Sequence, residues 1–240
     1  MGNFTALAIA RNVKAGYDIR TEGITSEVAN KMVVYGSVEV HSCNQKAIEL
    51  LESALNIDPD YTWGRYDLAR ILIMDGQWNA AADHIEFLLA KDDRHEKYLC
   101  LKGLLFLHQK NYDAAIHYLR LSMSYYPFFK DTLMNLGIAY SLMGDYRSAE
   151  VYLIRAQQVH PKNMIPLMGL IENKLRAADF KGAQKYAAII NSTYSRVAIT
   201  HQLQNFSKDP LSLFLSAEII APVIENQYAN NFKESSEISN

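Results

Sequence analysis

Residues 130–163 read KDTLMNLGIAYSLMGDYRSAEVYLIRAQQVHPKN, and this stretch decides the fold. Its apolar residues recur at the spacing of one helix face: Leu133, Leu136 and Tyr140. Gly144 marks a turn after this first helix. Pro161 ends a second helix, because proline has no N–H group with which to continue the hydrogen bonding. The stretch is therefore predicted to be a helix–turn–helix unit.

The same chemistry recurs about every 34 residues along the chain. An alanine of the second helix recurs without exception: Ala47, Ala81, Ala115, Ala149 and Ala183. An aromatic residue follows the turn in all but the first case: Asn44, Trp78, Tyr112, Tyr146 and Phe180. The first helix carries a small residue in the three central cases: Tyr35, Ala69, Gly103, Gly137 and Ile171. The second helix carries a larger apolar residue in all but the last: Leu51, Ile85, Leu119, Leu153 and Ala187. Three of the five repeats end in proline: Pro59, Asp93, Pro127, Pro161 and Ser195.

These columns have a common physical reason. The small residue of the first helix and the alanine of the second meet where the two helices approach most closely. A larger side chain there would push the helices apart, which typically costs ~1–3 kcal/mol. The aromatic residue fills the remaining space between the two helices.

The pattern resembles the tetratricopeptide repeat family over residues 26–197. The resemblance implies an all-α, right-handed solenoid of about five helix–turn–helix repeats. We expect these repeats at residues 28–61, 62–95, 96–129, 130–163 and 164–197. The first and last repeats have lost some of the pattern, as expected of terminal repeats, which lack a neighbour on one side.

The flanking segments are predicted to cap the stack. Residues 1–25 read as an amphipathic N-terminal capping helix, with a dimerisation or docking helix as the alternative. Residues 198–228 are expected to form C-terminal capping or docking helices. Their apolar segment Leu211–Ile224 could cap the stack, lie in the chain's own groove or bind a partner. Residues 229–240 are polar, so we expect a disordered tail.

Composition limits the partners and the compartment. The formal net charge is −2, so we expect no nucleic-acid partner. No apolar stretch approaches the roughly 20 residues of a membrane span, and the apolar run at residues 4–10 is too short for a signal peptide. Cys43 and Cys100 lie outside any C-x-x-C motif, and we expect both to be free thiols in a cytoplasmic protein.

The sequence contains no pattern that predicts catalysis. It has no H-E-x-x-H, G-x-S-x-G or glycine-rich phosphate motif and no zinc-ligand spacing. The acidic stretch at residues 92–96 falls between two repeats, where a solvated turn accounts for it better than a metal site. We therefore expect a protein that is not an enzyme and has no cofactor or metal.

The resemblance also implies where a partner would bind. In this family the first helices line a concave groove that holds a peptide or a helix. The matching positions here, which we call the groove positions, are Trp63, Tyr66, Arg70, Met74, Lys97, Leu104, His108, Met134, Asn135 and Ile138. Some family members clamp a C-terminal carboxylate with Lys, Asn and Arg side chains in this groove. Only Asn135 is retained here, and Cys100, Leu104, Ile165 and Gly169 occupy the companion positions, so we expect no such clamp.

The groove positions are rich in Met, Leu, Ile and aromatic residues, which favour an apolar ligand. The predicted function is a non-catalytic protein-interaction scaffold, or chaperone-like adaptor, that binds an apolar helix or extended peptide in this groove. The alternative is an assembly module that forms homo-oligomers or docks onto a membrane-associated complex through its flanking helices.

Overall fold

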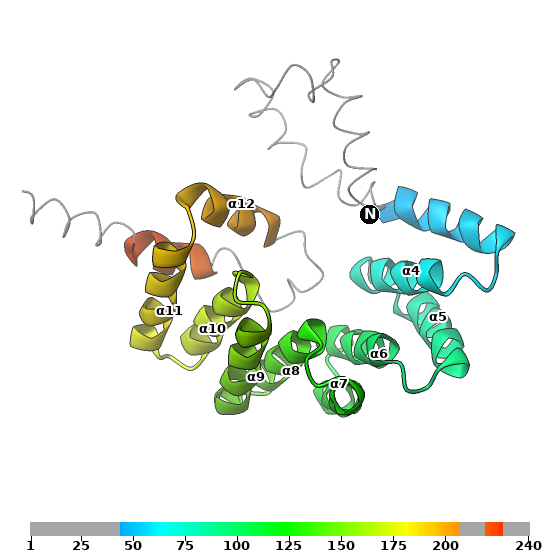
Figure 1. The fold of residues 1–240 in the computed structure, drawn as a ribbon, viewed down its shortest axis with the longest axis horizontal. Coiled ribbons are helices and arrows are strands. Elements are labelled where there is room, and N and C mark those ends of the chain that lie inside the picture. Colours follow the sequence, from blue (N-terminus) through cyan, green and yellow to red (C-terminus); the bar gives the residue numbers. More distant parts are fainter. Residues whose placement is uncertain (1–43, 207–218, 228–240) are drawn as a thin grey trace, which may run out of the picture. The chain divides into compact units, whose positions relative to one another are not determined.

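The computed structural model describes residues 44–206 and 219–227, and every regular element within these ranges is a helix (Figure 1). The predicted N-terminal helix at 1–25, the start of the first repeat and the tail at 229–240 lie outside the described residues. The chain divides into two compact parts between Leu88 and Leu89, within α5, and each part is described by itself.

The first part contains a helix at residues 44–57, then α4 (Thr62–Met74) and most of α5 (Trp78–Lys91). The second part begins within α5 and continues with three helix pairs, which are α6 (Glu96–His108) with α7 (Tyr112–Tyr125), α8 (Lys130–Leu142) with α9 (Tyr146–Val159), and α10 (Ile165–Arg176) with α11 (Phe180–Thr193). It ends with α12 (Arg196–Phe206) and a short helix at residues 219–227. The predicted all-helical repeat fold is confirmed for the described residues.

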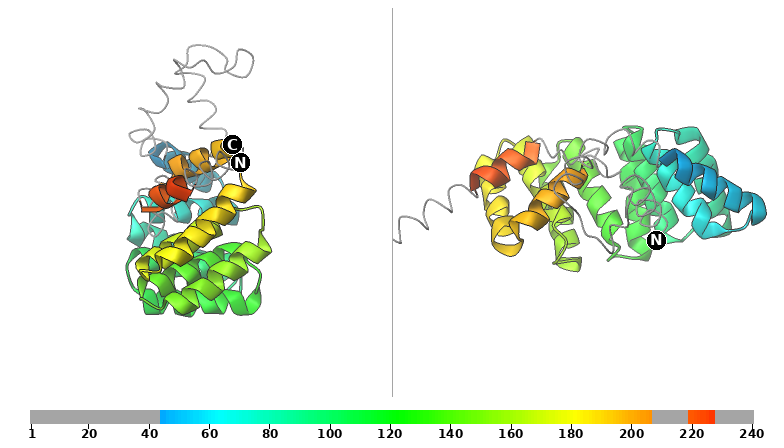
Figure 2. Two further views of the ribbon diagram at one scale, coloured as in Figure 1. Left: turned by 90° about the vertical axis from the view of Figure 1, so that its left-hand side faces the viewer. Right: turned by 90° about the horizontal axis from the view of Figure 1, so that it is seen from above.

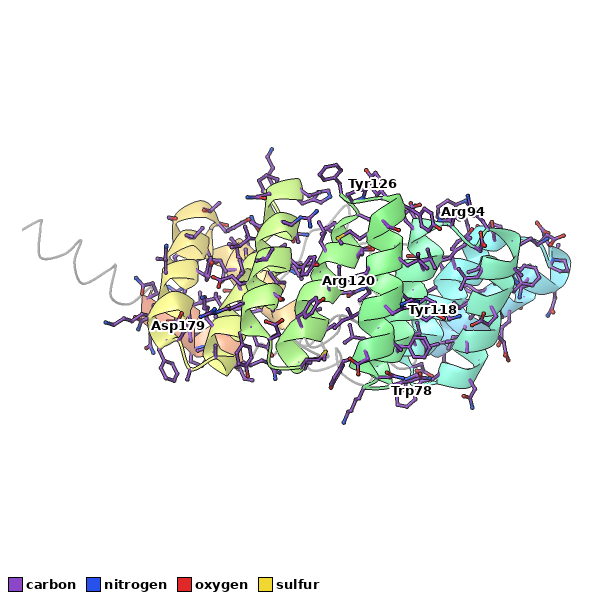
Figure 3. All side chains as sticks on the ribbon, turned by 90° about the horizontal axis from the view of Figure 1, so that it is seen from below. Trp78, Arg94, Tyr118, Arg120, Tyr126 and Asp179 are labelled. Atoms are coloured by element: carbon purple, nitrogen blue, oxygen red, sulfur yellow. The ribbon has the colours of Figure 1, made fainter. Side chains whose placement is uncertain are left out.

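The second part is a regular stack of these pairs (Figure 2). Each first helix packs on its own second helix, and each second helix packs on the first helix of the next pair. The first helices α6, α8 and α10 also contact one another in succession. They are buried along most of their length, whereas α7, α9 and α11 each bury only three residues. The second helices therefore present most of their side chains to solvent, among them Arg120 of α7 (Figure 3).

The small residues lie where the sequence places them, at the contact within each pair. The alanines of the second helices at 81, 115, 149 and 183 are all fully buried. A Cβ atom added to Gly137 would lie 2.6 Å from Cγ of Leu153 and 3.3 Å from the Ala149 carbonyl oxygen. A Cβ atom added to Gly103 would lie at the same distances from Cγ of Leu119 and from the Ala115 carbonyl oxygen. The first helix can approach this closely only because it carries no side chain there.

The turns inside the pairs share one backbone conformation. Gly76, Lys110, Gly144 and Ala178 stand 34 residues apart, and their φ angles are 79°, 60°, 85° and 57°. In each turn the N–H group of the following residue donates to a carbonyl oxygen in the last turn of the first helix, at 2.8–2.9 Å. This pattern is a Schellman motif. Backbone hydrogen bonds therefore set the turn even where the left-handed residue is not glycine.

Side-chain caps begin three of the second helices. Asn111, Asp145 and Asp179 accept hydrogen bonds from the backbone N–H groups of Ala114, Ser148 and Gly182, at 3.2, 3.1 and 2.9 Å. Each cap partners one of the N–H groups that the first turn of a helix leaves without an intrahelical acceptor.

Replacing Asp145 with alanine is expected to lower the free energy of unfolding by about 1 kcal/mol at neutral pH. Hydrogen bonds from the side chain and the backbone of Ser148 hold the pKa of Asp145 below its ordinary value. A lowered folded-state pKa gives stability that is present above the unfolded-state pKa and is lost as the pH falls through the folded-state pKa. The difference between the two proteins should therefore shrink below about pH 4.

Urea unfolding of both proteins at several pH values measures this difference. Asp145→Asn is the control, because it keeps the acceptor oxygen without the charge and should retain most of the stability at neutral pH. A deficit of Asp145→Ala that grows as the pH falls would contradict the assignment.

The helix at residues 219–227 packs onto the end of this stack. Ile220 and Ile224 are buried within the same hydrophobic cluster as α8, α10 and α11. The Asn191 side chain of α11 donates a hydrogen bond to the Ile224 carbonyl oxygen at 3.1 Å. Ile224 also stands 34 residues after the buried Ile190, so it continues the spacing of the second helices. These contacts favour the capping interpretation for this end of the Leu211–Ile224 segment, whose residues 211–218 lie outside the described residues.

Candidate protein-binding groove

In the first part, the groove positions lie along α4 at partly exposed sites. Trp63 is 54% exposed, and Tyr66, Arg70 and Met74 are half-buried. The rings of Trp63 and Tyr66 make an edge-to-face contact with their centroids 6.3 Å apart. Two aromatic rings one helical turn apart thus form a small apolar surface that a partner side chain can reach.

In the second part, two polar groove positions on α6 are partly exposed, whereas the apolar groove positions are buried. Lys97 and His108 of α6 are half-buried. The apolar positions are closed, because Leu104 is 8% exposed, Met134 1% and Ile138 2%. Met134 and Ile138 belong to the hydrophobic cluster of this part. Spacing predicted an apolar surface at these three positions, whereas in this structure their side chains are buried.

Asn135 is a buried polar residue among these groove positions. Its Nδ2 group lies 3.6 Å from the Cys100 sulfur, as a donor. Its Oδ1 atom is buried and accepts no hydrogen bond from the residues that the structure describes. An unmatched buried acceptor costs about 1–3 kcal/mol. The Asn135 side chain therefore has a buried acceptor that no described residue satisfies.

The side chains at the companion positions of Asn135 carry no charge. Burial raises the pKa of the Cys100 thiol to about 12, so that it is a neutral thiol at physiological pH. Leu104 and Ile165 are apolar, and Gly169 has no side chain. These positions supply no cation for a carboxylate, which is the reason for expecting no carboxylate clamp here.

Sequence reasoning missed a polar network that joins three helices. Lys174 of α10 lies 2.8 Å from a carboxylate oxygen of Glu150 in α9 and 3.3 Å from one of Asp179. The Tyr186 hydroxyl of α11 donates to the other Glu150 oxygen at 2.9 Å. The hydrogen bond with Glu150 is the main cause of a raised Lys174 pKa. The network joins α9, α10 and α11 and is a structural feature of the stack rather than a ligand site.

The described residues contain no group of three or more His, Cys, Asp or Glu side chains placed to hold a metal ion. None of the helices that these residues form is both long and apolar enough to cross a lipid bilayer.

Comparison with known families explains the repeat. One family model described as Tetratricopeptide repeat matches residues 44–105, and a second with the same description matches residues 96–129 and 131–163. The chain belongs to the tetratricopeptide repeat family. The matched residues cover the helix pairs through α8 and α9, where the alanine and small-residue columns are strongest.

Relatives of this tetratricopeptide repeat protein share its fold at low identity. The DnaJ homolog subfamily C member 7 homolog of Dictyostelium discoideum is 26% identical over a match of 174 residues that covers 65% of this chain. The chain spans about a third of that relative, at 32% of its length. A thermophilic tetratricopeptide repeat protein of Thermus thermophilus has a TM-score of 0.60 at 18% identity, covering 72% of this chain and 93% of its own.

A third relative is PilW, described as a type IV pilus biogenesis factor, which has a TM-score of 0.59 at 18% identity and covers 86% of this chain and 93% of its own. At these identities, the solved structures show a shared fold.

Proposed function

We propose that this chain is a protein-interaction scaffold, or chaperone-like adaptor, that binds an apolar helix or extended segment of another protein at its groove positions. Tetratricopeptide repeat proteins are generally non-catalytic scaffolds, and the family membership supports that broad role. The unmatched Oδ1 atom of Asn135 is the observation that carries the finer proposal. A backbone N–H group of a bound segment would supply the missing donor, and this requires no charge on the ligand.

Binding at this surface includes an opening step. Leu104, Met134 and Ile138 are 8% exposed or less, so a partner reaches them only by displacing the groups that cover them. The apolar contacts that these three side chains lose on opening must be replaced by apolar contacts with the partner. This requirement favours a hydrophobic segment over a polar one. Lys97 and His108 are partly exposed on α6, the helix that also carries Leu104.

Site-specific photocrosslinking tests this function. A photoreactive residue placed at Lys97 or at Tyr66 is expected to crosslink a bound partner, because both positions lie on first helices and are partly exposed. The same residue at Lys185, which is exposed on the second helix α11, is the matched control and is expected to remain uncrosslinked. Mass spectrometry identifies the peptide that is attached.

Equal crosslinking from Lys185 and Lys97 would contradict a groove. Crosslinks that join two copies of this chain would instead support the alternative, an assembly module that forms homo-oligomers. One observation favours that alternative, since Val197 of α12 is 80% exposed. The cytoplasmic location and the absence of nucleic-acid partners stay predictions.

A further inference from the structure

A second surface, which shares no residue with the groove positions, has the character of a binding site. A hollow of about 960 Å³ lies in the second part of the chain, between the α9–α10 connection and α12. Small-ligand sites in proteins measure roughly 300–1,000 Å³, so the hollow is larger than a single side chain needs. The hollow opens to solvent. It is lined by the α9–α10 connection, by the α11–α12 connection and by one face of α12.

The hollow lies where the repeat spacing fails. First helices begin at Glu96, Lys130 and Ile165, with intervals of 34 and 35 residues, whereas α12 begins at Arg196, only 31 residues after Ile165. The α11–α12 connection is Tyr194 and Ser195 alone, while the α9–α10 connection takes residues 160–164. The short connection begins α12 early, and the space beside the longer connection stays open.

The walls of the hollow are held in place before any ligand arrives. The Pro161 carbonyl oxygen accepts a hydrogen bond from the Gln157 side chain at 2.9 Å and another from the Tyr194 hydroxyl at 3.3 Å. The Asn163 side chain accepts from the Ile165 N–H group at 3.0 Å. These bonds tie the two connections to each other and to α10. Little conformational entropy is then lost on binding.

The lining combines an apolar surface with positive charge. Met164 and Val159 contribute apolar surface, and Val197 projects from α12 with 80% of its surface exposed. Lys162 supplies a positive charge, and the other polar residues of the lining are uncharged amides and hydroxyls together with two histidines: Asn163, Gln202, Tyr194, Ser195, His160 and His201. Among the described residues, no Asp or Glu lines the hollow. Apolar surface beside a lysine, in a lining without carboxylates, is complementary to a hydrophobic side chain with carboxylates next to it.

We propose that this hollow binds an acidic segment of a partner protein by taking up one of its large apolar side chains, while Lys162 contacts a neighbouring carboxylate. The apolar side chain contacts Val197 and Met164. The imidazole group of His160, which also lines the hollow, can donate a hydrogen bond to the partner backbone or to a carboxylate. None of the residues that line this site is a groove position.

A defined peptide pair tests the site. Both fluorescein-labelled peptides contain one leucine, which is flanked by Glu and Asp in the first and by Gln and Asn in the second. Fluorescence anisotropy with the full chain is expected to show the acidic peptide binding about tenfold or more tightly than the amide peptide. Absence of saturable binding by the acidic peptide, or equal binding of the two, would overturn the proposal.

Two pairs of variants locate the binding. Lys162→Glu is expected to lower the affinity for the acidic peptide about tenfold. Lys185→Glu makes the same charge change on the exposed face of α11 and should change this affinity less than about twofold. Ala198→Trp fills the hollow from α12 and should abolish binding, whereas Gln184→Trp on α11 should not. Circular dichroism confirms that each variant is folded.

The controls distinguish this site from general charge attraction. Equal weakening by Lys162→Glu and Lys185→Glu would show that the peptide responds only to net charge. Undiminished binding by a folded Ala198→Trp protein would place the peptide elsewhere. Either result overturns the proposal, and neither bears on crosslinking from Lys97.

Discussion

Replacing Gly137 with valine is expected to lower the free energy of unfolding by about 3 kcal/mol. The added Cβ atom would lie 2.6 Å and 2.8 Å from Cγ and Cδ2 of Leu153, and 3.3 Å from the Ala149 carbonyl oxygen. Leu153 and Ala149 are fully buried, so neither can move away without disturbing the next pair. Overpacking of this kind separates α8 from α9 and weakens the contacts of both with their neighbours.

Gly137→Ala separates this packing effect from helix propensity. Alanine is favoured over glycine inside a helix by about 1 kcal/mol, so propensity alone predicts a more stable protein. The contacts with Leu153 and Ala149 oppose this gain, and we expect a net loss of about 1 kcal/mol. Urea denaturation measures both variants.

Gly64→Ala is the matched control for that comparison. The three atoms nearest to a Cβ atom on Gly64 all belong to the ring of Tyr61, which is itself exposed and can rotate aside. This variant should be neutral or slightly stabilised. A stabilised Gly137→Ala protein would contradict the close contact between α8 and α9.

The Cys100 thiol is expected to react with iodoacetamide about a thousandfold more slowly in the folded protein than in urea. The thiolate is the reactive form, and burial raises the pKa of Cys100 from 9.0 to about 12. At a pH near 8, this shift lowers the thiolate fraction by about three orders of magnitude. Cys43 is changed to serine in this experiment so that the measured rate belongs to Cys100.

Ser124→Cys provides the control for this measurement, because Ser124 is exposed on α7 and a cysteine there should react at an ordinary rate. Mass spectrometry at timed intervals gives both rates. Fast labelling of Cys100 in the folded protein would show that the surface around Asn135 opens readily. Such opening would change the groove from a closed surface to an accessible one.

The repeat could be predicted because its columns reflect packing inside single pairs. The alanines at 81, 115, 149 and 183 are fully buried, and Gly137 touches Leu153, as close helix contact requires. At two of the turns, the sequence does not predict that the backbone takes the left-handed conformation. Lys110 and Ala178 carry no glycine signal, and their conformation comes from the backbone hydrogen bonds of the Schellman motif.

The candidate sites were less predictable than the fold. Spacing alone placed Met134 and Ile138 on the first helices, but it contains no information on what covers them. The hollow beside α12 left no motif, since it results from a connection shortened to Tyr194 and Ser195. A change in helix spacing at the end of a repeat array is the sequence signal that could have located it.

The four turns keep one backbone geometry although the residue at the left-handed position differs, so the fold does not depend on the side chain there. Because backbone hydrogen bonds form each turn, the residues at 76, 110, 144 and 178 can be glycine, lysine or alanine without altering the loop. A side chain in this conformation costs roughly 1–2 kcal/mol. Mutation can therefore place or remove a charge at these exposed loop tips while the scaffold persists, so that lineages can diversify their surfaces within one inherited fold.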